Sequence, residues 1–235
     1  MRVLVLIPAR NEEASLPAVV ADVRRHAPDA EILVVDDASV DGTPDVLLRL
    51  GVRWLRMPQP IGLGAAVRTG LRYAISIGCE TVVRLDGDGQ HPAHAIELLL
   101  APLRQGRADA VVGSRYAAEA ATTPLLRRFT HQVLAGVLTA LTGQRVTDPT
   151  SGLWAFGPAV LPLMLDHHPS GYPEPELVMF LSRNGIRFVE VPVQMRDRLG
   201  GRTSLTLRRT AAAMARLLLL LVVVPLRSAV RNSHA

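Results

Sequence analysis

Lysine is absent from this 235-residue sequence, and all 26 of its basic residues are arginine. The absence excludes a Schiff-base lysine and the lysine of a Walker phosphate-binding loop. Cysteine is nearly absent too: Cys79 is the only one, which excludes an internal disulfide and a multi-cysteine metal site. We also expect no secretory signal, because only five apolar residues separate Arg2 from Pro8. The near-absence of cysteine favours a reducing compartment.

Aromatic residues are scarce as well, at 4% of the chain, and they do not alternate with the arginines. A stacking platform for single-stranded nucleic acid is therefore poorly supported, and we expect no nucleic-acid partner. What the chain does have is an apolar share of 49%, ample for a folded core, and a net charge of +5. A basic balance carried by guanidinium groups suits nucleotide ligands or an anionic membrane surface.

Apolar runs of strand length alternate with helical patterns through the first half of the chain. The patterns predict strands at 3–7, 32–35, 81–85 and 108–112, and helices at 12–26, 41–50, 62–77 and 93–104. Such alternation indicates an α/β fold, with right-handed crossovers and a mainly parallel sheet flanked by helices. The second half is less regular, with helices expected at 124–141, 174–184 and 203–227, a strand at 187–193 and a basic loop at 196–202.

Polar side chains follow three of these strands at the point where each strand ends. They are Asp36 with Asp37, Asp86 with Asp88, and Ser114 with Arg115. In open parallel sheets, ligands bind outside the carboxyl ends of the strands. The sequence therefore predicts one ligand site at this edge of the sheet.

The segment LDGDGQHP, residues 85–92, places Asp86 and Asp88 two positions apart among glycines. Two carboxylates this close repel each other unless a positive charge lies between them, and hard divalent cations prefer carboxylate and phosphate oxygens. A calcium loop of the EF-hand type is excluded because His91 stands where that loop needs glycine. A solvated acidic turn is the alternative to a metal site at this point.

A late stretch, 211–226, is almost purely apolar and is interrupted by Arg216. It is shorter than the roughly 20 apolar residues that cross a bilayer, so we do not expect a membrane span. Nearby arginines favour a position in the membrane interface, or against a small membrane protein. The alternative is a helix buried against its own domain or against another copy of the chain in a homo-oligomer.

Seven segments occur in a fixed order along the chain. They are IPARNEE (7–13), VDDASVDGT (35–43), IGLGAAVRTGL (61–71), LDGDGQHP (85–92), GSRY (113–116), DPTSGLWAF (148–156) and RLGGRTS (198–204). In this order they resemble family 2 glycosyltransferases of the GT-A fold, especially polyprenyl-phosphate glycosyltransferases of the dolichyl-phosphate mannose synthase type. The resemblance implies a catalytic domain over 1–202, with a donor-binding part at 1–116 and an acceptor-side part at 117–202. A C-terminal apolar and basic helix with a tail, 203–235, would follow.

The resemblance also implies the chemistry, an inverting transfer from a UDP- or GDP-sugar that depends on Mg²⁺ or Mn²⁺. It implies that Asp88, Asp86, Asp148 and Arg115 are catalytic and that Asp88, Asp86 and Gln90 hold the metal. Donor contacts would come from Pro8, Ala9, Glu12, Asp36, Asp37, Gly62, Asp86 and Gln90. The sugar and the nucleotide base stay open.

The acceptor implied by the resemblance is a polyprenyl phosphate, used in cell-surface glycan or glycolipid synthesis at the cytoplasmic face of a membrane by a peripheral, cytoplasmic protein. Such an acceptor is already anionic and needs cations to hold it. The candidates are Arg115, Arg127, Arg128, Arg198 and Arg202, the last two in a loop that would close over the diphosphate. A hydroxyl acceptor would need a base instead, with Asp148, Glu174 and Glu176 as candidates. A non-catalytic nucleotide-sugar-binding scaffold is the remaining alternative.

Overall fold

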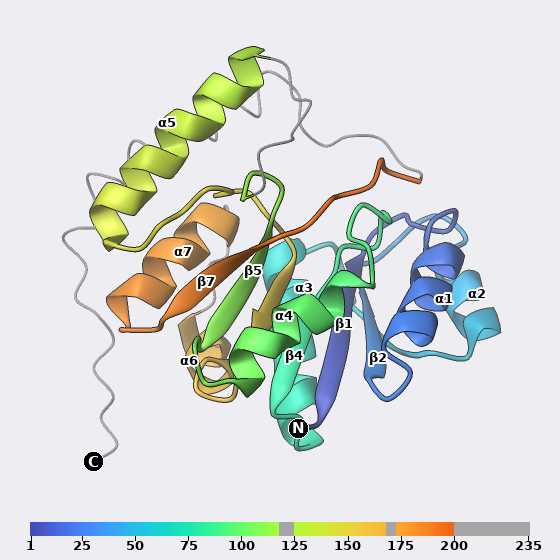
Figure 1. Ribbon diagram of the computed structural model, residues 1–235. Coiled ribbons are helices and arrows are strands. Elements are labelled where there is room, and N and C mark those ends of the chain that lie inside the picture. The colour runs from blue at the N-terminus through green and yellow to red at the C-terminus, as the bar shows by residue number, and fades with distance from the viewer. Residues whose placement is uncertain (118–124, 168–172, 200–235) are drawn as a thin grey trace.

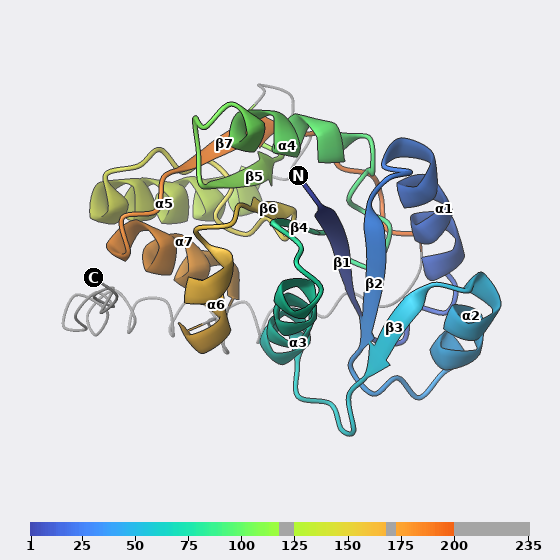
Figure 2. The ribbon, with the colours of Figure 1, turned by 90° about the horizontal axis from the view of Figure 1, so that it is seen from below.

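The computed structural model describes residues 1–117, 125–167 and 173–199. Seven strands form one sheet in the order β3-β2-β1-β4-β6-β5-β7, with helices on both faces (Figures 1 and 2). The strands are β1 Val3–Ala9, β2 Glu31–Asp36, β3 Arg53–Arg56, β4 Thr81–Arg84, β5 Ala110–Ser114, β6 Trp154–Phe156 and β7 Phe188–Pro192. The expected α/β class with a mainly parallel sheet is confirmed.

The helices divide between the two faces of the sheet according to their apolar stripes. They are α1 Leu16–His26, α2 Thr43–Leu50, α3 Leu63–Ser76, α4 Ala95–Arg104, α5 Leu125–Thr142, α6 Leu161–His167 and α7 Pro173–Arg183. One buried cluster joins α1, α2 and α4 to the sheet, and another joins α3, α5, α6 and α7 to the opposite face. Helix α3 lies so close to β1 that a Cβ at Gly70 would overlap the side chain of Leu6. Every residue of β1 is buried, as expected for a central strand covered on both faces.

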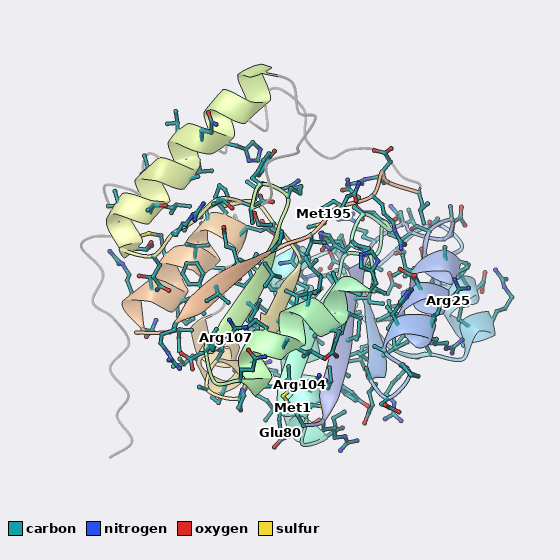
Figure 3. The ribbon with its side chains drawn as sticks, in the orientation of Figure 1. Met1, Arg25, Glu80, Arg104, Arg107 and Met195 are labelled. Carbon is teal, nitrogen blue, oxygen red and sulfur yellow. The ribbon has the colours of Figure 1, made fainter. Side chains whose placement is uncertain are left out.

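Strand β6 runs against its neighbours, pairing antiparallel with both β4 and β5. Trp154, its first residue, lies opposite Arg84 of β4 and Val112 of β5. An antiparallel strand begins at the edge where its parallel neighbours end. The segment before β6 therefore enters the same edge of the sheet as the carboxyl ends of β1, β2, β4 and β5. The opposite edge lies near the N-terminus, where Met1 and Glu80 form an ion pair (Figure 3).

Three elements were not predicted from the sequence, and all three are short. Strand β3 has only its two middle residues partly buried, so it lacks an apolar run. Strand β6 has three residues and α6 has seven, below the length at which a period can be recognised. The expected helix at 203–227 lies outside the described residues. Within the described ranges, no helix has both the length and the apolar character needed to cross a bilayer.

Candidate active site

Asp86 follows β4 and is fixed by two neighbours. Its Oδ1 accepts a hydrogen bond from Arg84 Nη2 at 3.2 Å, and its backbone N–H donates to Nδ1 of His91 at 3.0 Å. The Nε2 atom of His91 consequently faces the second carboxylate oxygen of Asp86, at 3.8 Å. Burial alone would raise the pKa of Asp86, but the nearby His91 and Arg84 outweigh it and hold that pKa below its usual value. Asp86 is thus a fixed, ionised carboxylate.

Arg84 is a site residue that sequence reasoning missed. It is 1% exposed, and its Nη2 also donates to Glu174 Oε1 at 3.0 Å. Its Nε and Nη1 atoms are buried with no hydrogen-bond partner among the described residues. The signal in the sequence was a single charge inside the buried run Val82–Leu85, where an unpaired arginine would be costly.

Glu174 lies in the first turn of α7 and reaches the donor side of the site through Arg84. Burial raises the pKa of Glu174, and the charge of Asp86 adds to this, while Arg84 acts in the opposite direction. The structure therefore places this predicted acceptor residue beside Asp86 rather than at a separate acceptor surface. Glu176 shares the same turn of α7.

Asp88 lies at the outer end of the same loop and is 5% exposed. Its Oδ1 accepts the backbone N–H of Gln90 at 3.0 Å, and its Oδ2 lies 2.9 Å from Arg198 Nη2. Among the described residues, no three His, Cys, Asp or Glu side chains gather closely enough to hold a metal ion. The residues still fit Mg²⁺ or Mn²⁺, because magnesium in nucleotide sites takes one or two carboxylates and completes its shell with phosphate oxygens and water. Asp88, a buried carboxylate whose present counter-ion is Arg198, has the negative charge that such a metal ion requires.

The glycines of the segment let it lie against β1. A Cβ at Gly87 would lie 3.3 Å from the carbonyl oxygen of Pro8 and 3.4 Å from Cβ of Ala9. Glu12, just beyond β1, accepts a hydrogen bond from the Ser15 hydroxyl at 2.7 Å. Burial raises the pKa of Glu12, and its carboxylate feels the charges of Asp88, Arg198 and Asp86. The structure thus places the end of β1 against the loop that carries Asp86 and Asp88.

Asp36 and Asp37 play different parts at the end of β2. Asp36 is fully buried; its Oδ1 accepts the Ser39 N–H at 2.9 Å, while its Oδ2 has no hydrogen-bond partner among the described residues. The same Oδ2 forms an ion pair with Arg56, at 3.6 Å from its Nε. Asp37 instead accepts the backbone N–H groups of Ile61 and Gly62, at 2.8 and 2.9 Å. Asp36 has an oxygen to offer a ligand, whereas Asp37 holds the turn that leads into α3.

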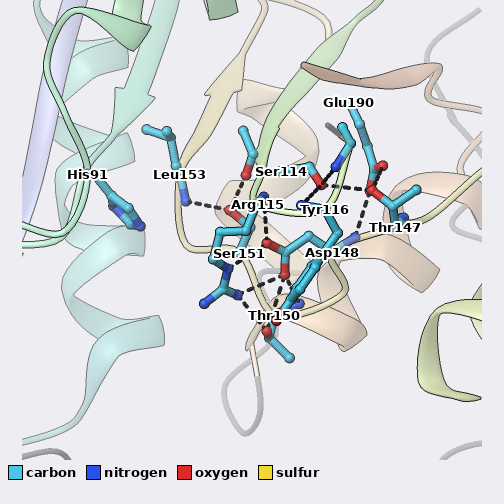
Figure 4. A network of polar contacts seen from close by, with 12 residues as sticks. His91, Ser114, Arg115, Tyr116, Thr147, Asp148, Thr150, Ser151, Leu153 and Glu190 are labelled. Atoms are coloured by element: carbon cyan, nitrogen blue, oxygen red, sulfur yellow. Dashed lines mark hydrogen bonds and ion pairs between the residues drawn. The ribbon is translucent and has the colours of Figure 1, made fainter. Parts of the chain in front are cut away.

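Arg115 and Asp148 form the centre of a second polar network, drawn in Figure 4. Arg115 Nε donates to Asp148 Oδ2 at 2.7 Å and Nη2 donates to Oδ1 at 2.8 Å. The same Nη2 reaches the Thr150 hydroxyl at 2.8 Å. Burial would raise the pKa of Asp148, but the hydrogen bonds and charge of Arg115 dominate and lower it. Such a carboxylate is poorly suited to accept a proton from an acceptor hydroxyl.

Glu190 of β7 supports this network through hydrogen bonds to the turn at Thr147 and Asp148. Its role was not predicted from the sequence. Its Oε1 accepts the backbone N–H groups of Thr147 and Asp148, at 2.7 and 3.1 Å, and its Oε2 accepts the Thr147 hydroxyl. The Ser114 and Thr147 hydroxyls lie 2.7 Å apart, which links β5 to the same turn. The available signal was one acidic residue within the strand sequence FVEVP.

The remaining candidates are only partly placed. Arg127 and Arg128 fall in the first turns of α5, with side chains outside the described set, and Arg202 lies outside the described residues. Arg198 forms an ion pair with Asp88. A Cβ at Gly152, four residues after Asp148, would lie 2.6 Å from Asp86 Oδ2, so the turn that carries Asp148 and the loop that carries Asp86 and Asp88 are neighbours.

Comparison with known proteins identifies the family. The sequence pattern of Glycosyl transferase family 2 matches residues 4–157, more than half of the chain. An undecaprenyl-phosphate mannosyltransferase of Micrococcus luteus is 32% identical over 216 residues, covering 88% of this chain and 88% of that protein. A polyprenol monophosphomannose synthase of Mycolicibacterium smegmatis is 31% identical over 210 residues, covering 84% of this chain and 78% of the relative.

A solved structure supports the architecture. Glucosyl-3-phosphoglycerate synthase of Mycobacterium tuberculosis, in complex with Mn²⁺, UDP and phosphoglyceric acid, superposes with a TM-score of 0.70 at 22% identity, covering 94% of this chain and 77% of that one. At this identity the likeness concerns the fold. The chain therefore belongs to glycosyl transferase family 2 and is a glycosyltransferase with the GT-A fold.

Proposed function

We propose that this enzyme transfers a sugar, with inversion, from a nucleoside-diphosphate sugar to a polyprenyl phosphate. The observation that carries the proposal is the Arg115–Asp148 pair, which fixes a guanidinium at the site and occupies the carboxylate beside it. An anionic acceptor needs a fixed cation and no base. Relatives named as polyprenyl-phosphate mannosyltransferases support this acceptor class.

On the donor side, cleavage at the anomeric carbon leaves negative charge on the departing diphosphate. A divalent cation held by Asp88, with Gln90 and Asp86 nearby, would offset that charge when bound. Asp86 stays ionised and fixed by Arg84, so it can orient the sugar or the ribose. The Oδ2 of Asp36 can accept a hydrogen bond from the base or the ribose.

On the acceptor side, Arg115 would bind the acceptor phosphate, with Arg127 and Arg128 of α5 as further cations. The lipid requires contact with a membrane surface, which we assign to the apolar and basic segment 203–235 at the cytoplasmic face. A phosphate oxygen then attacks the anomeric carbon directly, and no proton has to be removed.

A second candidate function is transfer to a hydroxyl acceptor. One observation favours it: Glu174 lies beside Asp86, and burial raises the pKa of its carboxyl. A carboxylate with a raised pKa is a better base than the tightly paired Asp148. Under this alternative Glu174→Gln abolishes transfer, whereas an enzyme acting on a lipid phosphate retains catalysis.

The test is transfer from a panel of UDP- and GDP-sugars to a short polyprenyl phosphate, with and without Mn²⁺ or Mg²⁺. We expect a metal-dependent glycolipid product, reduced at least about 100-fold in Asp88→Asn. Asp29→Asn, at an exposed aspartate remote from the site, is the matched control and should match the wild type. If donor binds and no sugar reaches the lipid, the acceptor assignment fails, and hydroxyl acceptors with Glu174→Gln become the next experiment.

A further inference from the structure

Residues 196–199, here called the strap, lie across the loop that carries Asp88. The Arg196 N–H donates to the Gln90 carbonyl at 2.9 Å, and the Leu199 N–H donates to the Asp88 carbonyl at 3.0 Å. A Cβ at Gly89 would lie only 2.6 Å from Leu199 Cδ1, so the strap closes on a position without a side chain. In Figure 1 the chain leaves β7 and runs across the sheet edge towards α1.

The strap is anchored independently of Asp88. Arg196 Nη1 forms an ion pair with Asp22 of α1 at 2.9 Å. A cavity of about 270 Å³ lies beneath, lined by Asp22, Arg25, His91 and Leu199 among others. Loss of a contact to Asp88 would therefore leave the strap held at its Arg196 end.

Arg198 supplies the positive charge at Asp88. Its Nη2 lies 2.9 Å from Asp88 Oδ2, while the other oxygen of Asp88 is occupied by the Gln90 N–H. Glu12 and Asp86 also feel the charge of Arg198, so it balances three carboxylates. The Arg198 side chain is 32% exposed, so it has a path into solvent. A guanidinium in contact with this oxygen repels a divalent cation that coordinates it, so the two positive charges compete for Asp88 Oδ2.

We propose that Arg198 is an exchangeable internal counter-ion of Asp88, which leaves Asp88 when the divalent cation binds there. This inference rests on the proposed function and adds a coupling to it. A cation arriving alone has to break the ion pair, whereas a cation arriving with a diphosphate brings anionic oxygens that Arg198 can contact instead. The nucleotide therefore strengthens metal binding, and by linkage the metal strengthens nucleotide binding equally.

The experiment measures Mn²⁺ affinity of the full chain by calorimetry, with and without UDP, in the wild type and in Arg198→Gln. Without UDP we expect Arg198→Gln to bind Mn²⁺ more tightly, by on the order of tenfold, because the competing charge is gone. The gain in Mn²⁺ affinity caused by UDP should be smaller in this variant than in the wild type. Arg198→Lys, which keeps the charge and loses the planar fork, should lie between the two.

Arg25→Gln is the matched control, because it removes one positive charge from the wall of the cavity beneath the strap, whereas the ion pair with Asp88 is made by Arg198. Its Mn²⁺ affinity should stay within about twofold of the wild type, since exposed charges are screened. Equal or weaker Mn²⁺ binding by Arg198→Gln would overturn the exchange while leaving the transferase proposal intact. Absence of Mn²⁺ binding in every protein, even with UDP, would remove both the exchange and the proposed metal dependence.

Discussion

Arg115 and Asp148 meet through two side-by-side hydrogen bonds, Nε to Oδ2 at 2.7 Å and Nη2 to Oδ1 at 2.8 Å. Only the planar fork of arginine makes such a pair, and lysine offers a single point charge. The plane of the Arg115 guanidinium is therefore already set by Asp148.

Arg115→Lys should lower kcat/KM for the acceptor by roughly tenfold to a hundredfold, because the cation is retained and its orientation is lost. Steady-state kinetics with varied acceptor would measure this. Arg187→Lys is the control: Arg187 makes a similar fork with Asp109, at 3.3 and 3.4 Å, but is 63% exposed and belongs to no part of the site. Equal losses in both variants would show that the Arg115 fork has no special role.

Asp148 should also set part of the pH dependence of stability. Its pKa is lower in the folded protein than in the unfolded chain, so its contribution is fully present above about pH 4 and disappears as the pH falls through the folded-state value. Asp148→Asn should cost about 2 kcal/mol in the free energy of unfolding near pH 7, as it leaves a partly buried arginine without its partner. Urea denaturation at several pH values should show the gap between wild type and variant closing below about pH 4. A gap that stays constant with pH contradicts this assignment.

Glu190 is a positioning residue, since it acts on Arg115 through the Thr147–Asp148 turn. Glu190→Ala strands two buried N–H groups and should raise KM for the acceptor several-fold more than KM for the donor, with a stability loss of about 1–3 kcal/mol. Glu190→Gln keeps an oxygen that can accept these hydrogen bonds, so it should restore most of the stability and most of the affinity for the acceptor substrate. Acceptor and donor kinetics measured on the same preparations separate this from simple unfolding, which would lower the apparent kcat and leave both KM values unchanged.

Gly152 lies against the carboxylate of Asp86. A Cβ there would lie 2.6 Å from Asp86 Oδ2 and 3.1 Å from Arg84 Nη2. Gly152→Ala should therefore displace Asp86 and reduce transfer by about 100-fold, the cost of a misplaced catalytic group. Gly136→Ala on α5, where a Cβ meets nothing within 4 Å, should leave transfer intact and raise stability by up to about 1 kcal/mol. Thermal melts and product formation for the pair would check both expectations, and a fully active Gly152→Ala would contradict the first.

Most of the parallel part of the fold could be predicted from sequence, because its elements other than β3 have a period and a length that can be read locally. β1 and α3 illustrate this, one as a buried aliphatic run and the other as an amphipathic helix between glycines. The reversed strand β6 could not, since three residues carry no period and its direction depends on β4 and β5 on either side.

The residues of the site also fall into those that could be predicted from the sequence and those that could not. The carboxylates at strand ends follow from the rule that parallel strands finish at one edge. Partnerships across long separations do not: Arg84 meets Glu174 from 90 positions away, and Arg198 reaches Asp88 from beyond the last strand. Such pairs depend on packing between elements, which local patterns do not encode.

The reversal of β6 has a consequence for how such enzymes diversify. The aspartates at the ends of β2 and β4 lie before position 117, whereas Asp148 and Glu174 come later in the chain, one just before β6 and the other in α7. We expect a graft of 125–199 from another family member to change the part of the site around Asp148 and Glu174 while keeping the aspartates at the ends of β2 and β4. The contacts that cross the junction must survive the transplant: the hydrogen bond between Arg84 and Glu174, the ion pairs of Arg115 with Asp148 and of Arg198 with Asp88, and the close approach of Gly152 to Asp86. The two parts of the site can therefore be exchanged between family members only where the contacts that join them are kept.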